Sequence, residues 1–186
     1  MKDLARCAMI VALISLVGCL PFGLGDPEKS TADDKLVGVW LSEPKDGEQQ
    51  MFIVSGFDAR TMLVAQYSFK RNGDAIEASD RGNYKAWITP IGDKQFITLE
   101  AKTANILEKE PEFISAKYDL KGDQFIAQGL NVDTVKKANI DSAEKLTKYV
   151  TEHLQDAELL IDPVTYTKVS KDKKEEVEKI LQAFHE

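Results

Sequence analysis

The stretch TMLVAQYSFKRNG, residues 61–73, decides the fold class that the sequence predicts. Apolar and polar side chains alternate along it, which is the two-residue period of a strand with one buried face. Asn72-Gly73 follows directly, and both residues tolerate positive φ angles, so the strand should end in a tight hairpin turn. We therefore expect an antiparallel hairpin whose inward face carries Leu63, Ala65, Tyr67 and Phe69.

Similar short runs lie on both sides of this hairpin. Gly92-Asp93 and Gly122-Asp123 supply two more tight turns, and a turn every 8 to 12 residues is typical of an antiparallel up-and-down meander. Such a meander closes into a barrel or a strongly curled sheet. The expected strands cover residues 36–42, 50–57, 61–70, 83–90, 95–101, 113–120, 124–131 and 164–169. Candidate residues for lining an interior cavity are Leu63, Tyr67, Phe69, Tyr84, Ile114 and Tyr118.

Helical patterns appear only towards the C-terminus. Asp141 with Glu144 three residues later forms a capping-box pattern, and an apolar stripe follows over residues 143–154. Residues 171–186 form a second amphipathic pattern. The sequence therefore predicts a mostly β domain, residues 35–186, with two C-terminal amphipathic helices.

The N-terminus has the order of an export signal. Basic side chains precede an apolar run over residues 8–17, and small Gly18 precedes Cys19. The stretch Leu16-Val17-Gly18-Cys19 resembles the bacterial lipobox. The resemblance implies a signal peptide of residues 1–18, cleavage between Gly18 and Cys19, and diacylglyceryl transfer to the Cys19 sulfur.

Two other interpretations of the N-terminus remain open. An uncleaved transmembrane anchor would need roughly 18 to 20 continuous apolar residues, whereas Pro21 and several glycines interrupt this window. Ordinary secretion, with cleavage after Gly25, would not explain why Cys19 stands at the position of the lipobox cysteine.

Residues 19–34 contain proline, glycine and small polar residues without a periodic pattern, which predicts a lipidated N-terminus followed by a flexible tether. Under the sorting rules of enterobacteria, Leu20 rather than Asp after the cysteine favours the outer membrane. Cleavage would also remove Cys7, so the mature domain would have no partner for a disulfide. The expected localisation is thus a lipid anchor in the envelope.

Gly38-Val39-Trp40 opens the first expected strand and resembles the Gly-x-Trp signature of lipocalins. The resemblance implies an up-and-down barrel with Gly38 and Trp40 at its closed end, and a small apolar ligand at the other. The chain departs from that pattern, because seven strands rather than eight precede the helix and a terminal helix is added. A half-open sheet wrapped on the helices, with Trp40 as an ordinary core aromatic, is the alternative.

No residue set predicts an active site. The only histidines are His153 and His185, so neither a metal site nor a catalytic triad is expected, and no cofactor motif is present. Removing residues 1–18 leaves 22 basic and 30 acidic side chains, a net charge of −8 that disfavours nucleic acid.

Two functions, neither of them enzymatic, come first, and an enzyme, which would need carboxylates or a histidine converging in one cleft, comes third. One is a ligand-binding barrel, which needs an internal cavity above about 300 Å³ open away from Trp40. The other is an envelope protein with a filled core and a protein partner, which would show an exposed apolar patch.

Overall fold

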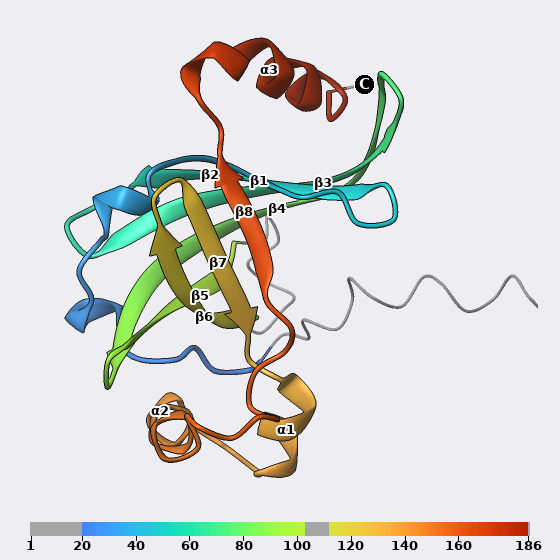
Figure 1. Ribbon diagram of the computed structural model, residues 1–186. Coiled ribbons are helices and arrows are strands. Elements are labelled where there is room, and N and C mark those ends of the chain that lie inside the picture. The colour runs from blue at the N-terminus through green and yellow to red at the C-terminus, as the bar shows by residue number, and fades with distance from the viewer. Residues whose placement is uncertain (1–19, 103–111, 186) are drawn as a thin grey trace, which may run out of the picture.

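The protein forms a closed barrel of eight antiparallel strands in up-and-down order, in which each strand pairs with the next and β8 pairs with β1 (Figure 1). The computed structural model describes residues 20–102 and 112–185. The strands are β1 (Gly38–Ser42), β2 (Glu48–Gly56), β3 (Thr61–Asn72), β4 (Ala75–Ile91), β5 (Lys94–Ala101), β6 (Phe113–Lys121), β7 (Gln124–Gly129) and β8 (Val164–Lys168).

Closure depends on β8, which follows the first helices and fills the gap between β7 and β1. Trp40 lies opposite Lys168 and Ser42 opposite Tyr166 on one side, and Phe125 lies opposite Tyr166 on the other. The predicted mostly β meander is confirmed. The alternative of a half-open sheet is wrong, because the eighth strand leaves no free edge.

The β3–β4 hairpin turns at Gly73, as expected, but β4 begins at Ala75 rather than near residue 83. The polar stretch around Asp80, which lies between the expected strands 61–70 and 83–90, is therefore part of a strand. The first half of β4 does not alternate between apolar and polar side chains, because most of its residues are exposed. The pairing of β3 with β4 also shifts in register between Ser68 and Phe69.

The predicted inward face of β3 is wrong for Leu63 and Tyr67, although Phe69 does line the cavity. Val64 and Gln66 point into the barrel, whereas Leu63 is 42% exposed on the outside. Tyr67 also lies outside, where its ring packs edge-on against Phe184 with 5.0 Å between the ring centres. Both faces of β3 are apolar because a helix covers the outer one, so alternation alone could not tell inside from outside.

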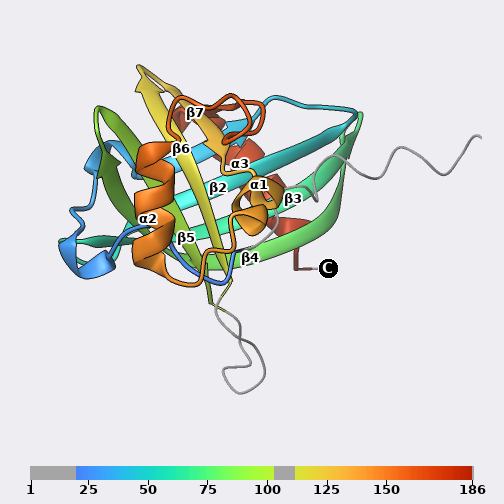
Figure 2. The ribbon, with the colours of Figure 1, turned by 90° about the horizontal axis from the view of Figure 1, so that it is seen from below.

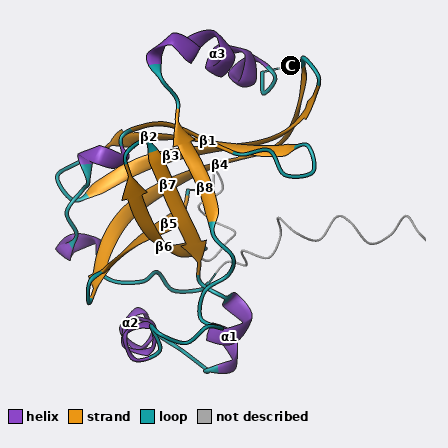
Figure 3. Cartoon of the chain, in the orientation of Figure 1, coloured by secondary structure: helices purple, strands orange, loops and turns teal. Residues whose placement is uncertain are grey.

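Three short helices flank the barrel (Figure 3). α1 (Val132–Lys137) and α2 (Ala143–Glu152) connect β7 to β8 and lie along one wall, seen from below in Figure 2. α3 (Lys174–Gln182) lies on the opposite side and packs its Ile180 with Met51 and Phe69 of the barrel. The two predicted amphipathic helices are thus α2 and α3. α1 was not predicted, and the cap of α2 is Ser142 rather than Asp141.

Residues 20–34, predicted as a flexible tether, instead form a strap along the barrel, and its first part, residues 20–25, packs between the barrel wall and the helices α1 and α2 (Figure 1). Leu20 is 3% exposed and Leu24 is fully buried. Both contact a core cluster that contains Phe96 of β5 and Leu146 of α2. The prediction failed because the glycines and the proline resemble linker composition. Here the small residues allow the strap to lie close to the wall.

The predicted signal peptide and Cys19 lie outside the described residues. Over residues 20–102 and 112–185, no helix has both the length and the apolar character needed to cross a bilayer.

Candidate ligand-binding cavity

The barrel interior holds a cavity of about 520 Å³. Its closed end, the floor, is formed by Leu36 and Trp40. Its other end, the mouth, is lined by residues remote from Trp40, among them Glu48 at the start of β2, Asp80 of β4 and Asp162 just before β8. A volume of this size falls within the range of small-molecule sites.

Trp40 seals the floor and is 2% exposed. Its indole N–H donates to the Leu36 carbonyl at 2.7 Å, so its polar atom is satisfied inside an apolar core. The Lys168 ammonium lies 5.1 Å from the centre of the indole ring, within cation–π range, and donates to the Lys35 carbonyl at 3.2 Å. Gly38 adopts φ +142°, and a Cβ there would lie 2.7 Å from Cε of Lys168. The Gly-x-Trp residues therefore lie at the closed end of the barrel.

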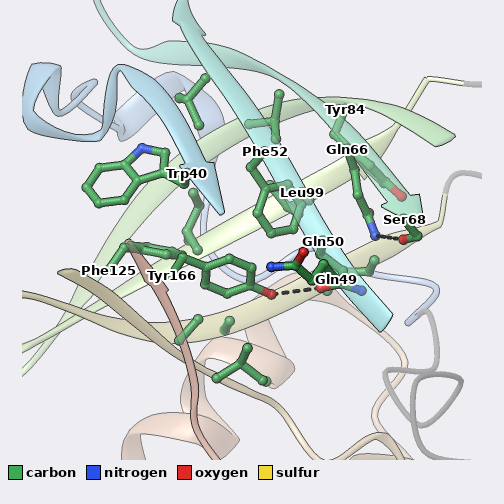
Figure 4. Close-up of a pocket in the computed structure, with 18 of the residues that line it drawn as sticks. Trp40, Gln49, Gln50, Phe52, Gln66, Ser68, Tyr84, Leu99, Phe125 and Tyr166 are labelled. Atoms are coloured by element: carbon green, nitrogen blue, oxygen red, sulfur yellow. Dashed lines mark hydrogen bonds between the residues drawn. The ribbon is translucent and has the colours of Figure 1, made fainter. Parts of the chain in front are cut away.

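Aromatic side chains form one wall of the cavity beside Trp40 (Figure 4). Phe125 lies 5.8 Å from Trp40 and 5.8 Å from Tyr166, measured between ring centres, and Phe52 lies 5.1 Å from Tyr166. Tilted contacts of this kind hold rings in fixed orientations. The lower cavity is consequently a rigid apolar pocket.

Polar side chains become more frequent towards the mouth. The Tyr166 hydroxyl donates to Oε1 of Gln50 at 2.8 Å, and Gln66 Nε2 lies 3.4 Å from the Ser68 hydroxyl (Figure 4). Burial raises the pKa of Tyr166, so its hydroxyl stays neutral at physiological pH. Since Oε1 of Gln50 accepts from Tyr166, the Gln50 amide N–H groups can donate to a ligand.

The carboxylates of the mouth are exposed to solvent or paired. Glu48 lies 3.3 Å from the Lys70 ammonium, an ion pair that largely offsets its charge. Asp80 and Asp162 are exposed on β4 and just before β8. The open end of the cavity is therefore polar and acidic, in contrast to the apolar floor.

The candidate lining residues separate into three groups. Phe69, Tyr84 and Ile114 line the cavity. Tyr118 is buried in the interior core beside Phe125, with ring centres 5.6 Å apart, but it does not line the cavity. Leu63 and Tyr67 were wrong, because they lie on the outer face of β3.

The sequence reasoning missed the polar lining, which includes Gln49, Gln50, Gln66 and Ser68. A signal existed in β2, where Gln50, Phe52 and Val54 follow at intervals of two and all line the cavity. The register of β2 and β3 places Phe52 opposite Gln66. Directly opposite residues share a face of a sheet, so the inward Phe52 fixes Gln66 as inward too.

The histidines lie away from the cavity in the described part of the chain. His153 ends α2, where its Nδ1 lies 2.7 Å from an Asp156 carboxylate oxygen. Within residues 20–102 and 112–185, no three His, Cys, Asp or Glu side chains are grouped so that they could hold a metal ion.

Comparison with known proteins found no relative of this chain. The chain matches no protein-family model, no curated protein and no solved structure. The function must therefore be argued from the geometry of the cavity and from the chemistry of the N-terminus.

Proposed function

We propose that this protein is a lipid-anchored, non-enzymatic lipoprotein of the cell envelope that binds a small, elongated and mostly apolar molecule inside its barrel. The observation that carries the proposal is the cavity of about 520 Å³, closed at Trp40 and open at the opposite end. A protein whose interior served only as core would fill this space with side chains, because voids larger than a water are few in cores.

The lining specifies the kind of ligand. The aromatic floor offers no hydrogen-bonding group to a ligand, since the Trp40 N–H is already bonded to Leu36. Gln50, Gln66 and Ser68 lie farther towards the mouth and can bond a polar end group. The exposed Asp80 and Asp162 disfavour an anionic end group at this opening. The ligand that fits best has an apolar body and a neutral or cationic end.

Two sequence features support the rest of the proposal. The lipobox-like stretch ending at Cys19 supports a lipid anchor, and Leu20 after it favours the outer membrane where the cell has two membranes. The Gly-x-Trp motif, lying at the closed end of the barrel, supports a lipocalin-like mode of ligand binding. Neither feature involves nucleic acid or a cofactor.

Two measurements on the processed chain test this proposal. Native mass spectrometry of the untagged protein should show the acyl mass on Cys19 and a co-purifying molecule. The neutral fluorescent probe N-phenyl-1-naphthylamine should bind and be displaced by that molecule.

A cavity-filling variant, Ala116→Phe with Ala127→Phe, should lower the affinity for the probe at least about tenfold, or about 1.4 kcal/mol, because the added rings occupy the space that the probe needs. Both alanines line the cavity. The control variant, Val37→Phe with Leu63→Phe, adds the same rings at exposed positions and should bind like the parent.

Equal probe affinity in both double variants, with no co-purifying molecule, would contradict ligand binding. The result would favour the alternative, an envelope protein that acts through a protein partner. Circular dichroism of each variant, compared with the parent, separates lost binding from lost folding.

A further inference from the structure

The strap begins at the mouth of the barrel. β6 starts there with Phe113, and its next residue, Ile114, lines the cavity. The Leu20 N–H donates to the Phe113 carbonyl at 2.8 Å, and the Phe113 N–H donates back to the Leu20 carbonyl at 3.0 Å. Leu20 therefore lies one residue along β6 from a side chain that faces the ligand site.

Hydrogen bonds fix the strap to the barrel wall. The Leu24 carbonyl accepts from the Trp87 indole at 2.8 Å and from the hydroxyls of Thr89 and Thr98, each at 3.1 Å. The Gly25 N–H donates to the Thr147 hydroxyl of α2 at 3.1 Å. These bonds lie in a largely buried layer, where exchanging them for water would be costly.

Close packing and direction complete the geometry of the strap. A Cβ at Gly23 would lie 2.6 Å from the Trp87 ring, so the strap leaves no room for a larger residue there. From Leu20 the strap runs to the floor, where the Ala32 N–H donates to the Ala59 carbonyl in the turn between β2 and β3. Its N-terminal end is thus fixed at the mouth and its C-terminal end at the floor.

We propose that the lipid anchor holds the mouth of the barrel against the bilayer, so that the ligand passes directly between membrane and cavity. This inference rests on the proposed function, because it uses both the acylated Cys19 and an apolar ligand. Cys19 is bonded to Leu20, so no free chain separates the acyl groups from the barrel rim. Two or three acyl chains give stable anchoring, and direct transfer keeps an apolar ligand out of water.

The side chains that line the mouth include carboxylates and, among the described residues, no basic group, so we expect the acyl chains rather than these side chains to hold the mouth at the membrane. Asp80 and Asp162 are exposed there, while Glu48 is paired with Lys70. An anionic bilayer repels acidic groups within about a Debye length of its surface. Transfer should therefore be faster from zwitterionic vesicles than from vesicles rich in phosphatidylglycerol, and salt should reduce the difference.

Orientation can be measured with a single fluorescent label, because acylation consumes the Cys19 thiol. Lys102→Cys places the label at the mouth, and Asp93→Cys places it in the floor turn between β4 and β5, both at exposed positions. The lipoproteins are reconstituted in phosphatidylcholine vesicles that contain a lipid with a nitroxide on its head group. We expect strong quenching of the mouth label and little of the floor label, and equal or reversed quenching would overturn the proposal.

A linker variant tests the consequence for transfer. About 15 Gly and Ser residues inserted between Cys19 and Leu20 reach about 20 Å on average and free the barrel from its fixed orientation. Stopped-flow uptake of N-phenyl-1-naphthylamine from vesicles should slow about tenfold, since effective concentration falls with linker length. Affinity for the probe without vesicles should not change.

Uptake from vesicles at the parent rate in the linker variant would overturn the fixed orientation. Failure of the proposed function would be seen in different measurements. Mass spectrometry would show no acyl group on Cys19, or the parent protein would not bind the probe in the absence of vesicles.

Discussion

The floor and the mouth of the barrel are built from different chemistry, although the same strands form both. At the floor, the Trp40 N–H bonds to the Leu36 carbonyl, and the Lys168 ammonium lies over the indole ring and bonds to the Lys35 carbonyl. At the mouth, Gln66 and the exposed carboxylates leave space and bonding capacity. Under the proposed function, stability depends mainly on the floor and ligand selectivity on the mouth. Substitutions should therefore change one property and leave the other largely intact.

Trp40→Ala should have the largest effect on the stability of the floor. Loss of the buried indole leaves a cavity and removes the donor to the Leu36 carbonyl, which predicts a loss of about 3–5 kcal/mol in unfolding free energy. Urea denaturation followed by circular dichroism measures it. Trp40→Phe, which keeps a ring but loses the N–H, should lose less. A loss below about 1 kcal/mol for the alanine variant would show that Trp40 does not seal the floor.

Gly38→Ala should have a smaller effect at the same end. The φ of +142° is strained for any residue with a Cβ, and the new methyl group would approach Lys168. We expect a loss of about 1–3 kcal/mol in unfolding free energy.

A double-mutant cycle with Lys168→Ala separates the two causes of this loss. If backbone strain dominates, the loss from Gly38→Ala stays the same in the Lys168→Ala background. If the contact with the lysine dominates, the loss becomes smaller there. No loss in either background would contradict a structural requirement for glycine.

The contrast between the two ends also explains which features the sequence could predict. The meander and the hairpin at Gly73 depend on local turn chemistry and were predicted correctly. The inward face of β3 depends on α3, more than a hundred residues away, which makes the outer side of Tyr67 apolar as well. Local alternation carries no information about such a distant cover.

The strap was missed for a related reason. Leu20 and Leu24 alternate with small residues in a pattern that composition assigns to a linker. Their burial depends on a groove between α2 and the barrel wall, and therefore on tertiary packing. The polar part of the cavity was missed because β3 was assigned the opposite face. Once the register with β2 is known, Gln66 follows directly from Phe52.

Gln66→Leu should have the smallest effect on stability and a selective effect on binding. The side chain is half-buried, and its one hydrogen bond, to Ser68, is long at 3.4 Å. The unfolding free energy should therefore change by less than about 1 kcal/mol. A long-chain alcohol, whose hydroxyl needs a partner near the mouth, should bind up to about tenfold more weakly, which corresponds to about 1.4 kcal/mol. The alkane of equal length should bind as well as before or better, because leucine extends the apolar wall.

Displacement of N-phenyl-1-naphthylamine by the two ligands measures both affinities. An equal change for alcohol and alkane would place the polar end of the ligand elsewhere and would remove the assigned role of the mouth in selectivity.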